Sequence, residues 1–119
     1  MELMYEIVII KMDDQFITEI FKYLKKRKNL SKKKSYTAHL LNNRELLGKK
    51  IGEESSELII DFIKENRQGI VNESADLIYH LLVLWISVGV NPQEVWNELN
   101  NRTLKSGFEE KNSRSLKDE

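Results

Sequence analysis

Residues 49–76 read KKIGEESSELIIDFIKENRQGIVNESAD, and the spacing of the acidic residues in this stretch decides how the whole chain is interpreted. The stretch holds two pairs of acidic residues three positions apart, Glu54 with Glu57 and Glu73 with Asp76. Residues three apart on a helix share a face, so each pair directs two carboxylates the same way. The pattern predicts two helices, each carrying one acidic pair.

A break at Asn66, Gln68 and Gly69 separates the two predicted helices, which we place at 45–64 and 70–88. If the chain turns back at this break, the four carboxylates converge on one small volume. Like charges held close disfavour ionisation, so such a cluster calls for a cation. Oxygen ligands select Mg²⁺, with Mn²⁺ as an alternative, over zinc.

Composition restricts the class of protein. The 119 residues are enough for one domain, and 32% charged with 40% hydrophobic residues indicates a soluble globular fold. One Pro and five Gly favour an all-α fold, a four- to five-helix bundle. The formal net charge is zero, which gives no general case for nucleic-acid binding. The absence of Cys excludes disulfides and thiolate metal sites.

The two ends of the chain are set apart from this domain. Residues 1–12 are predicted to be an N-terminal extension of unknown role, and 13–119 the domain, with a polar tail from about 103. Met12 is an alternative start, which the mass of the protein made from its native transcript would test. The apolar run at 7–10 is too short to span a bilayer and lacks the features of a secretory signal, so we expect a cytoplasmic protein.

A first helix is predicted after Asp13 or Asp14, either of which suits an N-cap. Its apolar stripe consists of Phe16, Ile17, Ile20, Phe21 and Leu24. Basic residues follow: Lys25, Lys26, Arg27, Lys28, Lys32, Lys33 and Lys34. They are typical of a solvated helix end that complements the helix dipole, or they attract a phosphate-rich ligand.

The next helices are marked by their caps. Ser35 or Thr37 suits the N-cap of a short helix, and Gly89 suits the end of the helix at 70–88. Further on, Asn91 is predicted to cap a helix with Pro92 in its first position and Glu94 in its third; its apolar edge is Val95, Trp96 and Leu99. The helix at 45–64 has an apolar side formed by Leu47, Ile51, Leu58 and Phe62.

The second half of the helix at 70–88 is apolar nearly all round. Such a helix must be covered on every side, and so short a chain can hardly do this alone. We therefore expect a homodimer that includes this helix in its interface. The alternative is a monomer in which the helix is wholly interior.

The chemistry predicted for the acidic cluster is phosphoanhydride hydrolysis of a nucleotide. A metal there neutralises charge on phosphoryl oxygens, and Glu53 or one of the four acids takes the proton of the attacking water. Lys49 and Lys50 lie one turn earlier and are placed to meet the polyphosphate. His80, on the same face as Asp76, is expected to be a hydrogen-bonded partner rather than a metal ligand. A Walker-type glycine loop is absent, which excludes a P-loop enzyme.

Two segments, KIGEESSE at 50–57 and ESADLIYHLLVL at 73–84, resemble the phosphoribosyl-ATP pyrophosphohydrolases. These belong to the all-α nucleoside triphosphate pyrophosphohydrolases, together with MazG-like and dimeric dUTPase groups. The Ser-Tyr-Thr run at 35–37 and the segment SGFEEKNSR at 106–114 resemble features particular to the histidine-pathway member. The similarity covers about 14–114, without the cyclohydrolase that is fused to many relatives.

The resemblance implies Mg²⁺-dependent hydrolysis of phosphoribosyl-ATP to phosphoribosyl-AMP and pyrophosphate, the second step of histidine biosynthesis, by a homodimer. The residues that it implies as metal ligands are Glu54, Glu57, Glu73 and Asp76, and Glu53 joins them in the catalytic set. The implied substrate contacts, together with those expected above, are Lys49, Lys50, His80, Lys105, Lys111 and Arg114.

Three other interpretations remain. A MazG-like pyrophosphatase acting on noncanonical nucleoside triphosphates would use the same acids and metal. A helical dimerisation module with a vestigial acidic patch would gain no stability from metal. Nucleic-acid binding through the basic residues at 25–34 is weaker, because no aromatic residues alternate with that charge.

Overall fold

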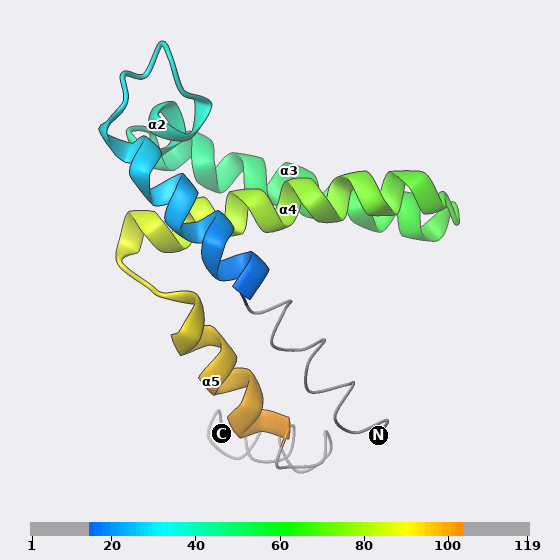
Figure 1. Cartoon of the computed structure of the whole chain (residues 1–119). Coiled ribbons are helices and arrows are strands. Elements are labelled where there is room, and N and C mark those ends of the chain that lie inside the picture. Colours follow the sequence, from blue (N-terminus) through cyan, green and yellow to red (C-terminus); the bar gives the residue numbers. More distant parts are fainter. Residues whose placement is uncertain (1–14, 104–119) are drawn as a thin grey trace, which may run out of the picture.

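The computed structural model describes residues 15–103. The expectations for 1–14 and for the tail after 103, including the cap at Asp13 or Asp14, lie outside the described residues. Within 15–103 the regular elements are all helical, which confirms the all-α class (Figure 1). They are a helix at 15–26, a 3₁₀ helix η1 (Arg27–Asn29), α2 (Tyr36–Leu41), α3 (Arg44–Ile63), α4 (Arg67–Val88) and α5 (Pro92–Thr103).

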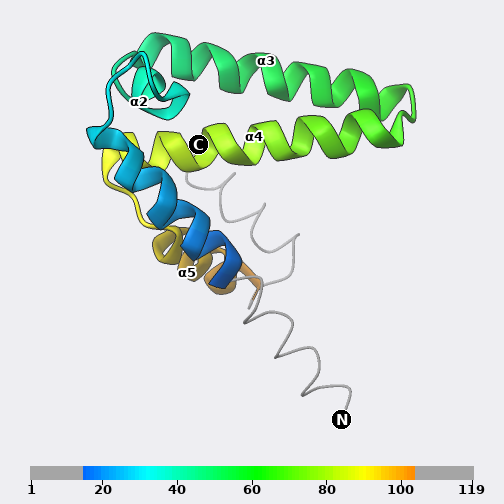
Figure 2. The same cartoon turned by 45° about the horizontal axis from the view of Figure 1, so that its top comes forward.

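The two longest helices, α3 and α4, lie side by side and antiparallel, as both views show (Figures 1 and 2). Each begins at an asparagine whose side chain accepts a backbone N–H of the first turn. Asn43 accepts from Leu46 at 3.1 Å, and Asn66 accepts from Gly69 at 3.2 Å. These caps satisfy N–H groups that a helix start leaves without partners. The chain therefore turns back between the two acidic pairs.

The position predicted for the break was wrong by a few residues. Gln68 and Gly69 lie in the first turn of α4, and the connection is made by residues 64–66. Glu65 adopts a positive φ of 56° there. The sequence-based bounds of 45–64 and 70–88 become 44–63 and 67–88, since the asparagine caps make both helices begin earlier than predicted.

Gly69 is required by the close approach of the two helices rather than by the turn. A Cβ atom at this position would lie only 2.5 Å from the carboxyl group of Asp61 on α3. Asn66 also donates from Nδ2 to Asp61 at 3.3 Å, so Asp61 and Asn66 join the helices at the turn. The absence of a side chain at Gly69 lets this end of the hairpin close.

The core lies at the opposite end of the hairpin, where the helix at 15–26, α2, the start of α3 and the second half of α4 meet. Its buried members are Phe21, Leu24, Leu40, Leu47, Leu82, Val83, Trp85 and Ile86. Trp85 packs edge-to-face on Trp96 at 6.0 Å between ring centroids, which holds α5 against α4. Three residues predicted on apolar faces are exposed instead: Phe16 at 65%, Phe62 at 70% and Leu99 at 52%.

The predictions for the ends of α2, α4 and α5 are confirmed for Ser35, Gly89 and Glu94 respectively. The Ser35 hydroxyl accepts the Ala38 N–H at 3.2 Å, so Ser35 and not Thr37 caps α2. Gly89 has φ 75°, a left-handed conformation that favours glycine, and it ends α4. The carboxylate of Glu94 accepts the backbone N–H of Asn91 at 2.8 Å, which fixes the start of α5.

Large apolar side chains are exposed near the turn of the hairpin. They come from the end of α3 and the start of α4 and are Ile59, Ile60, Phe62, Ile63 and Val71. We call this set the apolar tip. A separate apolar groove of about 420 Å³ lies between the helix at 15–26 and α4, with Phe16, Ile20 and Ile78 among its walls.

Among the helices of 15–103, α4 is long and apolar enough by length and composition to cross a membrane. The core helix of a soluble protein passes the same test. Because α4 also carries Glu73, Asp76 and the buried His80, its apolar character is weak evidence for a membrane.

Candidate metal centre

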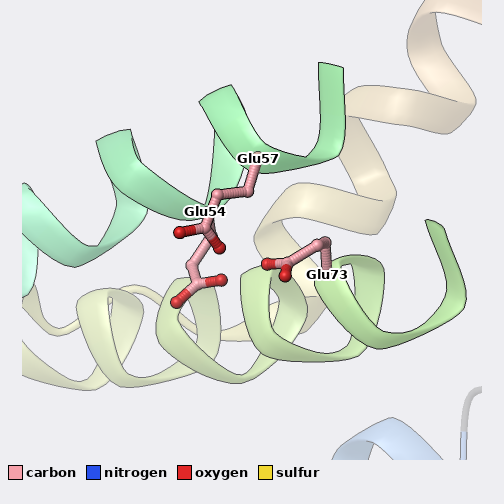
Figure 3. A group of neighbouring side chains, drawn as sticks. All are labelled: Glu54, Glu57 and Glu73. Atoms are coloured by element: carbon pink, nitrogen blue, oxygen red, sulfur yellow. The ribbon is translucent and has the colours of Figure 1, made fainter. Parts of the chain in front are cut away.

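Three glutamates from the two helices of the hairpin converge on one point. Glu54 and Glu57 project from α3, and Glu73 projects toward them from α4 (Figure 3). One carboxylate oxygen of each lies within 4.8 Å of the other two. We call these residues the acidic centre. The predicted convergence of the two acidic pairs therefore holds for three of the four residues.

The acidic centre is electrostatically strained. The pKa of Glu73 is raised mainly by a hydrogen bond with Glu54, which requires a shared proton. Burial and the charges of Glu54 and Asp76 raise this pKa further, whereas a hydrogen bond with Glu57 lowers it. A hydrogen bond with Glu73, followed by the charge of Glu73, raises the pKa of Glu57, while the charge of Lys50 opposes this. Without a cation, Glu57 and Glu73 therefore hold a proton more readily than a separate glutamate does.

The residues of the acidic centre fit a hard divalent cation. Oε2 of Glu73 is buried and has no hydrogen-bond partner, so this acceptor lacks a donor. Magnesium binds oxygen ligands at about 2.0–2.1 Å, so opposite ligands lie about 4 Å apart. Small side-chain rotations bring oxygens spaced within 4.8 Å to that separation. The donor set contains oxygen alone, as Mg²⁺ or Mn²⁺ prefers.

Asp76, the fourth predicted ligand, lies outside the group of three. Its side chain is exposed, and its charge still contributes to the raised pKa of Glu73. Asp76 is therefore a neighbour of the acidic centre on the same helix, at a greater separation than the sequence pattern predicts.

The predicted basic residues of α3 contact Glu53 rather than the acidic centre. Lys49 and Lys50 form ion pairs with the Glu53 carboxylate at 3.9 and 3.6 Å. These are (i, i+4) and (i, i+3) pairs on a solvent-facing helix surface, where such contacts are weak. Both ammonium groups therefore remain available to an anion that binds beside Glu54.

His80 is buried, and both of its ring nitrogens have partners within the protein. Nδ1 lies 2.8 Å from the backbone carbonyl of Asp76, and Nε2 lies 3.4 Å from the hydroxyl of Tyr36. A carbonyl only accepts, so Nδ1 carries the proton and donates to it. His80 thus joins α2 to the turn of α4 that carries Asp76. The other histidine, His39, is exposed.

Sequence reasoning missed a polar cluster that joins the Ser-Tyr-Thr run to α4. The hydroxyls of Thr37 and Tyr79 lie 2.6 Å apart, and the rings of Tyr36 and Tyr79 stack at 6.3 Å. Burial raises the pKa of Tyr79, against the hydrogen bond from Thr37. The three consecutive hydroxyl residues at 35–37 were the available signal, but Ser35 and Thr37 were considered only as helix caps, and Tyr36 was given no contact. The remaining predicted substrate contacts, Lys105, Lys111 and Arg114, lie outside the described part of the chain.

Comparison with known proteins agrees with this geometry. A family model described as phosphoribosyl-ATP pyrophosphohydrolase matches residues 17–103. Three curated relatives carry the name phosphoribosyl-ATP pyrophosphatase. That of Paramagnetospirillum magneticum is 42% identical over 88% of this chain and 97% of its own length. Those of Granulibacter bethesdensis and Gluconobacter oxydans are 39% and 35% identical, over 85% and 82% of this chain and 64% and 74% of their own lengths.

Proposed function

Because the chain belongs to the phosphoribosyl-ATP pyrophosphohydrolase family, we propose that it hydrolyses phosphoribosyl-ATP to phosphoribosyl-AMP and pyrophosphate, the second step of histidine biosynthesis. The structural observation that supports this function is the acidic centre, in which Glu54, Glu57 and Glu73 converge from two helices. The oxygen of a water molecule forms a new P–O bond, and the bridging P–O bond between the α and β phosphates breaks.

The acidic residues hold the ion that this chemistry needs. Glu54, Glu57 and Glu73 bind Mg²⁺, and Asp76 completes the predicted set of ligands from the same face of α4. When bound, the ion neutralises charge on the phosphoryl oxygens and makes a water more acidic. Support comes from the raised pKa values of Glu57 and Glu73 and from the unpartnered Oε2 of Glu73, since both indicate negative charge in need of a cation.

The residues beside the acidic centre orient the substrate and accept a proton. Lys49 and Lys50 exchange their weak contacts with Glu53 for oxygens of the polyphosphate. Glu53, released from its two ion pairs, accepts the proton of the attacking water. His80 keeps the turn that carries Asp76 joined to α2 through its two hydrogen bonds.

A pyrophosphate-release assay on phosphoribosyl-ATP, compared with dUTP, dCTP and ITP, tests the assignment. The expected result is a kcat/KM for phosphoribosyl-ATP at least a hundredfold above that for the other nucleotides; a site built to hydrogen-bond its substrate can discriminate by about ten-thousandfold. A preference for dUTP, dCTP or ITP would replace this function by that of a MazG-like pyrophosphatase. Glu57→Gln serves as the inactive control for contaminating activity.

We further propose that the working protein is a homodimer in the cytoplasm. Within residues 15–103, the apolar tip and the apolar groove are two surfaces that no described residue covers. Burying large apolar side chains stabilises an assembly by roughly 25 cal/mol per Å², so leaving both in water is unfavourable. A second copy that covers them accounts for their character.

Sedimentation equilibrium tests the dimer. The wild-type chain of 14.0 kDa is expected to sediment with twice that mass. The double variant Phe62→Glu/Ile63→Glu is expected to sediment as a monomer, because charges would enter an apolar interface. Lys64→Glu places the same side chain at the next position and should leave the dimer intact. A monomeric wild-type protein at micromolar concentration would refute the proposal.

A further inference from the structure

Arg27 is held in place by three contacts at the end of the first basic run. Its Nε donates to the hydroxyl of Ser35 at 3.2 Å, and its Nη1 donates to the hydroxyl of Tyr23 at 2.9 Å. Its guanidinium carbon also lies over the Tyr23 ring, 5.4 Å from the centroid. These contacts fix the orientation of a side chain that is otherwise rich in rotamers.

Among the residues that the structure describes, the positive charge of Arg27 has no counter-ion. The ion pairs within 15–103 join Lys22 to Glu19, Lys49 and Lys50 to Glu53, and Arg102 to Glu98, and none of them includes Arg27. Ser35 and Tyr23 are neutral acceptors, and they occupy two of the five N–H groups of the guanidinium. A fixed, half-buried guanidinium with free N–H groups and no carboxylate is suited to binding an anion.

Arg27 lies beside the polar cluster that faces α4. Ser35, which receives its Nε, caps α2, and the next two residues, Tyr36 and Thr37, contact His80 and Tyr79. Burial raises the pKa of Tyr79, and the positive charge of Arg27 lowers it. This effect indicates that the guanidinium lies near the Tyr79 side chain. Tyr79 and His80 follow Glu73 by about two turns, or roughly 10 Å along the helix axis.

We infer that Arg27, presented by Ser35 and Tyr23, binds the phosphate monoester on the second ribose of the substrate and thereby separates phosphoribosyl-ATP from simple nucleoside triphosphates. This inference rests on the proposed function. Phosphoribosyl-ATP carries anionic groups at two ends, a triphosphate and a distant monophosphate, whereas dUTP or ITP carries the triphosphate alone. The acidic centre with its metal serves one end, and Arg27, displaced along α4, serves the other.

Steady-state kinetics of Arg27→Gln on phosphoribosyl-ATP test the inference. The KM is expected to rise roughly ten- to a hundredfold, the size of a lost charge-assisted contact, while kcat changes less than threefold. Lys28→Gln removes the same charge from the same 3₁₀ helix and should change the KM less than twofold. An equal rise in both variants would show a general basic field and overturn the assignment to Arg27.

Product inhibition separates phosphate recognition from a structural role. Against the wild type, phosphoribosyl-AMP should inhibit at least tenfold more strongly than AMP; against Arg27→Gln the two should become similar. Weakening of both inhibitors by the same factor would overturn the inference, because AMP lacks the second phosphate. Tyr23→Phe removes one acceptor of Arg27 from an exposed ring and serves as a second variant in case Arg27→Gln folds poorly. It should also reduce the preference for phosphoribosyl-AMP over AMP, by a smaller factor.

The outcome for Arg27 is distinguishable from the outcome for the proposed function. A wild-type protein that releases no pyrophosphate from phosphoribosyl-ATP would refute the function itself. A wild-type protein that is active while Arg27→Gln keeps its KM would refute the phosphate contact alone.

Discussion

Glu73→Gln is expected to lower kcat/KM for pyrophosphate release from phosphoribosyl-ATP by roughly a hundred- to a thousandfold, the size of losing one group that stabilises charge in the transition state. Glu73 is the single member of the acidic centre that α4 supplies, and its Oε2 is the buried atom without a partner. Glutamine keeps the volume of the side chain but replaces one oxygen with a donor and removes the charge.

The measurement is steady-state kinetics at saturating Mg²⁺, with circular dichroism to verify the helices. Glu45→Gln is a matched control, since it removes an exposed carboxylate from the first turn of α3, on the partner helix of the hairpin. The control should retain activity within twofold. Activity of Glu73→Gln within tenfold of the wild type would show that the acidic centre is not the catalytic site.

Addition of Mg²⁺ at about a hundred times its dissociation constant is expected to raise the melting temperature by on the order of 10 °C at pH 7.5. An ion that binds only the folded state must stabilise it, and only the folded hairpin brings Glu54, Glu57 and Glu73 together. Differential scanning fluorimetry with Mg²⁺ and with EDTA measures the shift. An unchanged melting temperature would favour a helical dimerisation module with a vestigial acidic patch.

The pH dependence of this shift follows from the raised pKa values of Glu57 and Glu73. A carboxyl group whose folded pKa lies above its unfolded value stabilises the fold while protonated, at low pH, and that contribution is lost as pH rises through the folded pKa. Without metal, Glu57→Gln should therefore gain stability relative to the wild type between weakly acidic and neutral pH. The Mg²⁺ effect should shrink over the same range as pH falls, since protons compete for the same oxygens. A melting difference independent of pH would contradict this.

The all-α class and the acidic centre were predictable because both depend on helical periodicity. Glu54 and Glu57 share a face whenever 45–64 is a helix, and the polar break before Glu73 turns the chain. The turn itself was misplaced because glycine at 69 was interpreted as a helix breaker. The structure instead uses that glycine for close packing against Asp61 inside the first turn of α4.

The contacts around Arg27 and Tyr36 were not predictable for a different reason. The contacts that place this cluster against α4, Tyr36 with His80 and Thr37 with Tyr79, join residues 44 and 42 positions apart, whereas Arg27 contacts Tyr23 and Ser35 four and eight positions away. Periodicity describes which residues share a face of one element, but it carries no information about which face of α2 meets α4. Exposure of Phe62 was missed similarly, because an apolar stripe does not reveal whether the same chain covers it.

The short connection between α3 and α4 also bears on how the protein forms. All three members of the acidic centre lie within residues 54–73, so the site closes through neighbouring turns of one hairpin. Closing such a short loop costs little chain entropy, and topologies rich in local contacts fold fast. The ion-binding geometry therefore depends on this hairpin alone and forms without a contribution from α5.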